Sequence, residues 1–292
     1  MVASLRATIP RGLSHEIILV DDGSTDGTRE WLAGLGEPFR VILNERNMGF
    51  GAATNRGAAE ARGRILALLN NDLVLRPGWL CHMARILDAL GPRAGIVGNV
   101  QLDAATLEVD HAGIFINHKG KPEHFRDDPG PLRRLLFPIR EVFAATGACV
   151  LVRRDTWLML GGFDEAFVNG CEDVDLCLRA RESGLVNAVA LRSRVLHHVS
   201  ASPGRKLRDE QNTQRLVLRW RDEIALLGSR GWAWSLFCPL LPDPRDFPDT
   251  LEAWRTALYM AHVLSRPPPS VLAVINAAID GELARWSKMP SD

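Results

Sequence analysis

Residues 16–28 read EIILVDDGSTDGT, an apolar run that ends in carboxylates and continues into a glycine turn. Two more apolar runs follow at 39–44 (FRVILN) and 64–69 (RILALL), and stretches with helical character separate the three. Short apolar runs that alternate with helices predict parallel strands in an α/β sheet. Because such sheets bind ligands at the carboxyl ends of their strands, the polar residues that follow each run are the candidates for a site.

The same pattern predicts further elements up to about residue 200. The expected helices lie at 25–35, 49–62, 78–90 and 155–160 and from 172 onward, and the expected strands at 95–101, 143–153 and 194–198. Residues 117–140 are polar and basic and contain four prolines, so we expect a long loop there. Loops of that length are usually functional or mobile.

Composition excludes several classes of protein. The 35 Lys+Arg balance 35 Asp+Glu, without the basic surplus of a nucleic-acid-binding protein, so we expect no nucleic-acid partner. No run approaches the roughly 18 apolar residues of a membrane span, and the N-terminus lacks a secretory signal pattern. The five cysteines show no CxxC spacing, which favours reduced thiols. A cytoplasmic protein is expected.

The character of the chain changes beyond residue 205. Five of the eight tryptophans lie there, in stretches with helical periodicity. We therefore expect one α/β domain at 1–205 and a C-terminal helical extension at 206–292. Tryptophan usually packs in a helical core, but an exposed face of these helices is an alternative, as a peripheral contact with the inner face of the membrane or with a second copy of the chain.

Two segments have the chemistry of a nucleotide site. Asp21 and Asp22 end the first run, where acidic side chains accept hydrogen bonds from ribose hydroxyls or a base N–H; a capped turn is the alternative. Small residues at 47–55 (NMGFGAATN) open a helix whose N-terminus suits a diphosphate, unless they serve only close packing. The segment is not a dinucleotide fingerprint, because Thr54 stands where GxGxxG needs glycine.

Two others have the chemistry of a metal site. The third apolar run ends in Asn70, Asn71 and Asp72, polar groups that fit a divalent cation bound through oxygen. A single aspartate after a strand is more often a turn residue, so this assignment depends on its neighbours. His197 and His198 end the last predicted strand, and either can offer an imidazole to a metal.

An acidic cluster opens the helix that begins at residue 172. The sequence GCEDVD at 170–175 places acids in a first turn, which the helix dipole alone favours. The functional interpretation makes one of them a general base. Cys171 and Cys177 fit neither a zinc pattern nor a redox motif, so we expect them to serve packing.

Taken together and in this order, the motifs resemble the family 2 glycosyltransferases, which are inverting enzymes with the GT-A fold. The chain is most similar to bacterial rhamnosyltransferase-type and related polysaccharide or cell-envelope enzymes, which often read NND where others read DxD. The resemblance covers roughly residues 3–200. It rests on VDDGSTDGT (20–28), NMGFGAATNRG (47–57), LLNND (68–72), TGACVLVRRDTWLMLGGFDEAF (146–167) and EDVDLCLRARESG (172–184).

The resemblance implies a Rossmann-like, mostly parallel GT-A sheet and a metal-assisted transfer with inversion. The donor would be a UDP-, dTDP- or GDP-sugar, the acceptor a saccharide or a lipid-linked hydroxyl, and the cofactor Mg²⁺ or Mn²⁺. Asp173 would act as the general base. The implied sites are Asp21, Asp22, Asn47, Gly49, Asn70 and Asn71 for the donor, Asp72 and His197 for the metal, Gly147 and Ala148 for the acceptor side, and Asp173 with Glu172 for catalysis.

The N-terminus departs from the family pattern. Members begin with a strand that carries a Pro-x-Tyr-Asn type segment, whereas residues 4–7 (SLRA) resemble the tail of the helix after that strand. We therefore expect an N-terminally incomplete GT-A domain. The alternative function is a catalytically incomplete member that binds a nucleotide sugar or a partner. A nicotinamide-dependent oxidoreductase is a third alternative, which the missing GxGxxG disfavours.

Overall fold

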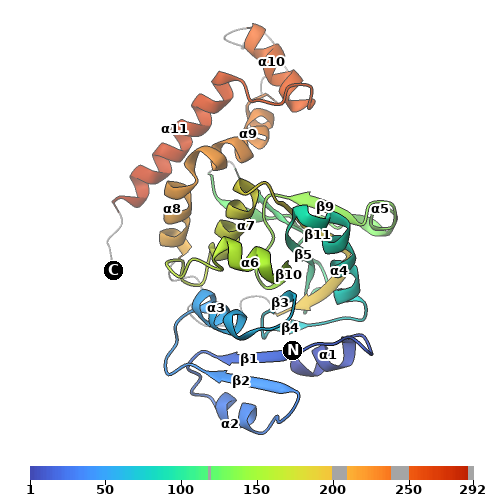
Figure 1. The fold of residues 1–292 in the computed structure, drawn as a ribbon. Coiled ribbons are helices and arrows are strands. Elements are labelled where there is room, and N and C mark those ends of the chain that lie inside the picture. The colour runs from blue at the N-terminus through green and yellow to red at the C-terminus, as the bar shows by residue number, and fades with distance from the viewer. Residues whose placement is uncertain (118–119, 199–208, 238–249, 289–292) are drawn as a thin grey trace. The chain divides into compact units, whose positions relative to one another are not determined.

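The computed structural model describes residues 1–117, 120–198, 209–237 and 250–288. The chain divides into two compact units, both drawn in Figure 1. Unit 1 comprises Met1–Ile114 with His124–Asp209, and unit 2 comprises Phe115–Glu123 with Glu210–Asp292. The domain boundary expected between residues 205 and 206 lies outside the described residues.

The three apolar runs form strands, as predicted. In the described residues the strands are β1 (Ile17–Asp21), β2 (Phe39–Leu43), β3 (Ile65–Leu69), β4 (Leu73–Val74), β5 (Ala94–Asp103), β6 (Val109–His111), β7 (Ile114–Ile116), β8 (Pro122–His124), β9 (Ile139–Val142), β10 (Cys149–Arg153) and β11 (Val186–His197). The last strand begins earlier than the predicted range of 194–198, because its first half is mostly apolar and, apart from Val186, buried.

These strands pair in more than one sheet. β1 and β2 are parallel and form a sheet of two, with Asp21 opposite Leu43. A seven-stranded sheet runs in the order β3-β10-β5-β11-β4, with β6 beside β5 and β9 beside β11. β5 and β11 are parallel, whereas β10 is antiparallel to both β3 and β5. The α/β class is confirmed, but β3 pairs with the antiparallel β10 and not with β1 or β2, which strand–helix alternation alone does not predict.

Helices cover these sheets (Figure 1). α3 packs on β1, α4 on β5, β10 and β11, and α7 on β5 and β11. The helices of unit 1 are α1 (Val2–Thr8), α2 (Thr28–Ala33), α3 (Phe50–Glu60), α4 (Trp79–Leu90), α5 (Gly130–Leu136), α6 (Arg154–Leu160) and α7 (Glu172–Glu182), with a 3₁₀ turn at Gly91–Arg93. Residues 4–7 therefore belong to a helix, as expected.

The core of unit 1 lies between α4 and the large sheet. Trp79, Met83 and Leu87 recur every fourth residue on one face of α4 and are fully buried. Leu5 of α1 and Ile17 of β1 belong to the same cluster. Burying side chains of this size is worth about 1.5–3 kcal/mol each. Packing therefore joins the small β1–β2 sheet to the large one.

Residues 117–140 are not the long loop that the sequence predicts. The segment contains β8 and α5, and β9 begins at Ile139. Pro131 stands in the first turn of α5, where a proline sacrifices no helical hydrogen bond, so a residue taken as a breaker begins a helix. The strand predicted at 143–153 is also shorter, because the backbone of Gly147 turns away to bond a side chain of α7.

Two thiols are part of the core. Cys149 and Cys177 are buried, and burial raises the pKa of each to about 12. All cysteines of the described residues are free thiols. The packing role expected of Cys177 is confirmed.

Unit 2 contains α8 (Asp209–Arg219), α9 (Arg221–Phe237), α10 (Thr250–Met260) and α11 (Pro269–Trp286). α10 and α11 pack on α9. Trp286 is buried, whereas Trp234 and Trp254 are exposed. A membrane or self-contact through these helices stays a prediction. In the described residues, none of the helices has the length and apolar character that crossing a membrane requires.

Candidate functional site

Asp22 binds the loop that precedes α3 through its carboxylate. Its Oδ1 accepts hydrogen bonds of 2.7 Å from Asn44 Nδ2 and 2.9 Å from the N–H of Met48, and its Oδ2 accepts one of 2.9 Å from the N–H of Gly49. Asn47 Oδ1 accepts a second bond from Gly49, at 3.1 Å. The carboxylate thereby fixes the glycine loop for which the sequence predicts a diphosphate.

Gly23 is required where β1 turns against this loop. Its φ is 80°, in the left-handed region that glycine tolerates. A Cβ at this position would lie 2.6 Å from the carbonyl carbon of Arg46 and from the nitrogen of Asn47. Only glycine lets the two loops approach so closely.

Asp21 is buried at the end of β1. Arg29 Nε donates a hydrogen bond of 2.8 Å to its Oδ2, and the N–H of Ser24 lies 3.3 Å from both oxygens. Burial alone would raise the pKa of Asp21, but the hydrogen bonds from Ser24 and Arg29 outweigh it and lower the pKa below its usual value. Arg29 also donates to the carbonyl oxygen of Asn44. The side chain of Asp21 at the end of β1 is therefore an ionised carboxylate with a fixed orientation.

The polar residues after β3 contact the turn before β10 and the end of β11. The N–H of Asn70 donates a hydrogen bond of 2.9 Å to the carbonyl oxygen of Ala148. Asp72 Oδ1 lies 3.3 Å from Nε2 of His197. His198 contributes its backbone instead, since its N–H donates to the Asp72 carbonyl oxygen at 3.0 Å. Of the two adjacent histidines, His197 is the one whose ring is buried beside Asp72.

These side chains fit a divalent cation that has further ligands from elsewhere. Oδ1 of Asn70 and both ring nitrogens of His197 are buried and make no hydrogen bond to any described residue. Such atoms cost about 1–3 kcal/mol each when nothing pairs with them, which favours a bound ligand. The described residues bring no three His, Cys, Asp or Glu side chains together as a complete metal site. Asp72 and His197 would thus be two ligands in a shell completed by phosphate and water.

Asp173 is held from both sides by backbone groups. Its Oδ2 accepts a hydrogen bond of 2.8 Å from the N–H of Gly147, and its Oδ1 accepts one of 2.8 Å from the N–H of Val174. A Cβ on Gly147 would lie 3.2 Å from Cβ of Asp173 and 3.4 Å from the ring of Phe50. The carboxylate is half-buried, with a fixed orientation.

The other acids of α7 hold the helix in place. Glu172 is buried, and its Oε2 accepts a hydrogen bond of 2.6 Å from the N–H of Gly170. Asp175 pairs with Arg179 at 2.8 Å, and Arg179 also donates to the carbonyl oxygen of Gly162 at 2.8 Å. Before the helix, Cys171 adopts a φ of 69°, which is rare outside glycine and common at functional sites.

Segment 146–148 brings the predicted groups together. The carbonyl oxygen of Ala148 accepts a hydrogen bond from the N–H of Asn70, and the N–H of its neighbour Gly147 donates one to Asp173. The ring of Phe50, which follows the Asp22 loop, lies against Gly147. The N–H of Phe50 in turn donates a hydrogen bond of 3.0 Å to Asn169 Oδ1, just before α7. A chain of hydrogen bonds and contacts thus links the loop before α3, Asn70 and Asp173.

Two histidines near segment 146–148 were not predicted from the sequence. His111 of β6 is fully buried, and its Nε2 accepts a hydrogen bond of 3.3 Å from the N–H of Thr146. Burial, and after it the neighbouring histidines, lower the pKa of His111 well below its usual value. His124 stacks edge-on at 4.7 Å. Burial lowers the pKa of His124 below its usual value and outweighs the carboxylates of Asp110 and Asp173, which raise it. No spacing in the sequence singles out either residue.

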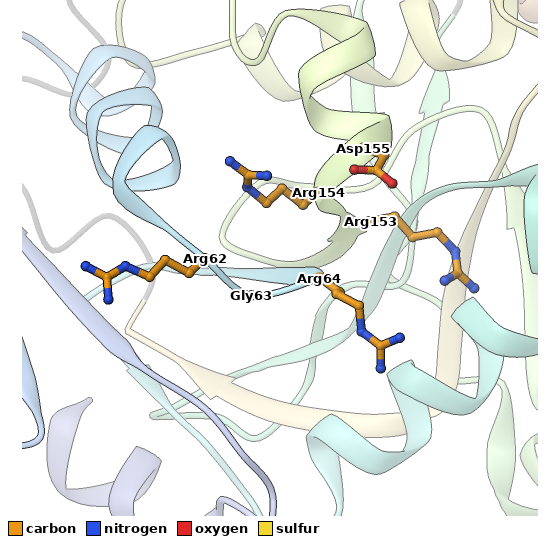
Figure 2. Close-up of a pocket in the computed structure, with 6 residues that line it drawn as sticks. All are labelled: Arg62, Gly63, Arg64, Arg153, Arg154 and Asp155. Carbon is orange, nitrogen blue, oxygen red and sulfur yellow. The ribbon is translucent and has the colours of Figure 1, made fainter.

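A pocket of about 170 Å³ lies away from these residues (Figure 2). Arg64 precedes β3, so the pocket is at the opposite end of that strand from Asn70. In Figure 2 the guanidinium groups spread apart and do not converge on one point. Its lining is Arg62, Gly63, Arg64, Arg153, Arg154 and Asp155. We therefore do not assign a ligand to it.

Several known proteins are similar in sequence to this chain. The O-antigen biosynthesis protein RfbC of Myxococcus xanthus is 34% identical over 195 residues, which are 64% of this chain and 15% of that protein. The N-acetylglucosaminyl-diphospho-decaprenol L-rhamnosyltransferase of Mycobacterium tuberculosis is 29% identical over 236 residues, which are 70% of this chain and 72% of that protein. The chain spans 26% and 15% of the lengths of two curated relatives that it matches.

Solved structures and a family profile complete the comparison. The crystal structure of GalNAc-T7 with UDP, GalNAc and Mn²⁺ superposes with a TM-score of 0.59 at 19% identity, over 89% of this chain and 51% of that one. This likeness shows the GT-A fold, as the sequence predicts. The profile of glycosyl transferase family 2 matches residues 1–156, more than half of the 292 residues. The chain therefore belongs to glycosyl transferase family 2.

Proposed function

We propose that this chain transfers a glycosyl group from a nucleotide-diphosphate sugar to an acceptor hydroxyl, with inversion of configuration, in the synthesis of a cell-envelope polysaccharide or related glycan. The observation that carries the proposal is the continuity of segment 146–148, which bonds Asn70 on one side and Asp173 on the other. One short backbone segment therefore contacts both a proposed donor-binding residue and the candidate base. The names of the relatives support a role in glycan assembly.

The donor occupies the ends of β1 and β2 and the loop in front of α3 in this proposal. Asp21 and Asp22 face the nucleoside, and Asn47 and Gly49 face the diphosphate. Most of the capacity of the two carboxylates is already used by hydrogen bonds within the chain. They thus act largely by holding the pocket in its binding shape before the donor arrives, which lowers the cost of ordering it on binding.

A divalent cation, Mg²⁺ or Mn²⁺, is held by Asp72 and His197, with Asn70 and Asn71 beside the ribose and diphosphate. When bound, it neutralises charge on the leaving diphosphate as a Lewis acid. The buried ring nitrogens of His197, which make no hydrogen bond to any described residue, support this assignment. The Mn²⁺ in the GalNAc-T7 structure supports it as well.

Asp173 is the general base. Its carboxylate takes the proton of the acceptor hydroxyl while that oxygen bonds to the anomeric carbon, and the bond from this carbon to the diphosphate breaks on the opposite face. The hydrogen bonds from Gly147 and Val174 aim the carboxylate, which general-base catalysis requires. Glu172 acts on catalysis through the loop that it ties down. Gly147 and Ala148 line the acceptor side, where a saccharide or a lipid-linked hydroxyl binds.

Release of nucleoside diphosphate from a panel of UDP-, dTDP- and GDP-sugars tests the proposal. Slow hydrolysis of one donor that stops with EDTA and returns with Mn²⁺ is the expected result. Binding of a donor by calorimetry without any release, with or without candidate acceptors, would instead identify a nucleotide-sugar binding module. If no donor binds and none is hydrolysed, both functions are contradicted.

A further inference from the structure

Helix α5 (Gly130–Leu136) carries its large apolar side chains on the outside. Leu132, Leu135 and Leu136 stand at i, i+3 and i+4 and share one face of the helix. With Phe137 they are between 60% and 67% exposed, and no residue of α5 is buried. Exposed apolar side chains that are contiguous in this way mark an interaction surface. We name these four residues the α5 patch.

Polar contacts, and not packing, hold α5 in place. Arg134 pairs with Asp128 at 2.6 Å, and the N–H of Gly130 donates to the same carboxylate at 3.0 Å. Arg192 of β11 donates hydrogen bonds of 2.9 and 2.5 Å to the carbonyl oxygens of Arg134 and Leu135. The helix is therefore fixed on the strand with its apolar face directed outward.

Cations surround the α5 patch. Asp127 and Asp128 are both engaged by arginines, Asp127 by Arg140 at 2.5 Å. Within the part of the chain that the structure describes, Arg133 of α5 and Arg192 beside it have no carboxylate at ion-pair distance. The patch thus has a cationic border.

An apolar centre with a cationic border fits one surface better than others. A second copy of the chain would place like charges near one another, because a two-fold contact sets the α5 patch and its cationic border against the same patch and border of the other copy. An anionic lipid surface accepts the leucines between its headgroups and attracts the arginines. We propose that the α5 patch docks this chain on anionic phospholipid. This docking does not depend on the transfer chemistry.

Flotation of the full chain with vesicles tests the proposal. Vesicles of phosphatidylcholine and phosphatidylglycerol in equal parts should carry the wild type upward, and phosphatidylcholine alone should carry much less. Leu135→Glu/Leu136→Glu should lower binding at least about tenfold, because it removes two inserted side chains. Arg133→Gln should lower it about fivefold, and on the anionic vesicles only.

The matched control is Leu158→Glu/Met159→Glu. These two adjacent side chains are also exposed near the end of a seven-residue helix, α6, but outside the α5 patch. This variant should float like the wild type. Far-UV circular dichroism identifies any variant that does not fold. Hydrogen exchange of wild-type residues 130–137 needs no variant, and it should slow when anionic vesicles are added.

Three results would overturn the proposal. The first is that the wild type does not float. The second is that the Leu135/Leu136 variant floats as well as the wild type, and the third is that vesicles leave hydrogen exchange in residues 130–137 unchanged. Light scattering adds a separate arm. If the wild type is a dimer that the Leu135/Leu136 variant converts to a monomer, and neither binds vesicles, the patch is a self-association surface.

Discussion

The N–H of Gly147 donates a hydrogen bond of 2.8 Å to Oδ2 of Asp173, and this bond joins the end of a turn before β10 to the first turn of α7. Gly147 lies so close to Asp173 that a Cβ would be 3.2 Å from the Cβ of the aspartate. The position of the candidate base is therefore set by a residue that has no side chain.

Gly147→Ala should lower kcat more than it changes donor affinity. The added methyl group meets Cβ of Asp173 and the rings of Phe50 and Phe163, so these neighbours must give by a few tenths of an ångström. Because a misplacement on the order of 1 Å can cost about a hundredfold in rate, we expect this smaller shift to lower kcat about three- to tenfold. Nucleoside diphosphate release measures the loss. Gly281→Ala, in open space on α11, is the control and should retain full activity.

Removing either proposed metal ligand should weaken binding of the cation directly. Asp72→Ala and His197→Ala each leave only one of the two proposed ligands, whose side chains lie 3.3 Å apart. Titration of Mn²⁺ in the presence of donor, followed by electron paramagnetic resonance, should show at least about a tenfold loss of affinity. Asp155→Asn, an exposed residue of α6, serves as the control. Unchanged Mn²⁺ affinity in both variants would place the cation elsewhere.

Gly23→Ala should destabilise the fold far more than Gly27→Ala. Both glycines have φ between 80° and 88°, which costs alanine about 1–2 kcal/mol. At Gly27 nothing lies within 4 Å of the new Cβ, whereas at Gly23 backbone atoms lie 2.6 Å away. We expect a loss of about 1 kcal/mol for Gly27→Ala and above about 3 kcal/mol for Gly23→Ala in urea unfolding. Equal losses would show that the loop yields to the methyl group.

Most strands and helices of the first hundred residues, though not β4, follow from the sequence because they have a clear local signal. β2 occupies the predicted run almost residue for residue, and α4 begins one residue after Gly78. The separation of β1 and β2 from the large sheet cannot be predicted from local sequence patterns, because strand pairing depends on contacts between distant segments. α5 is hidden for another reason, since its helix is stabilised by Arg192, far away in the sequence.

The site divides in the same way. Asp72 and Asp173 are predictable because each stands at the end or start of a predicted element with chemistry typical of its family. The structure adds that the ring beside Asp72 belongs to His197. His111 and His124 carry no such signal, because only the folding of β6 and β8 brings the two rings together. Tertiary packing, and not local pattern, decides these positions.

Glu210 should make the stability of unit 2 depend on pH in acid. Burial by itself raises the pKa of Glu210, but hydrogen bonds from Trp286, Arg285 and Lys121 outweigh it and lower the pKa from 4.5 to about 2. A lowered folded-state pKa contributes stability above pH 4.5 that is lost progressively as pH falls toward 2. Because the group is partly exposed, Glu210→Gln should cost only up to about 1 kcal/mol at neutral pH.

Thermal unfolding of the wild type and Glu210→Gln between pH 7 and pH 3 checks this pH dependence. The difference in melting temperature should shrink as pH falls. Glu223→Gln provides a carboxylate control within the same helical unit, on α9. A difference that is constant across the whole range would show that the charge of Glu210 is not what stabilises unit 2.

The most direct test of the central claim is the rate of nucleoside diphosphate release by Asp173→Asn, with donor affinity measured in parallel. General-base catalysis is worth about 10²–10⁴-fold, so the account predicts a loss of that size while donor affinity stays within a few-fold. Glu182→Gln, at the exposed end of the same helix, should behave as wild type. Release by Asp173→Asn at the wild-type rate would contradict the assignment of Asp173 as the base.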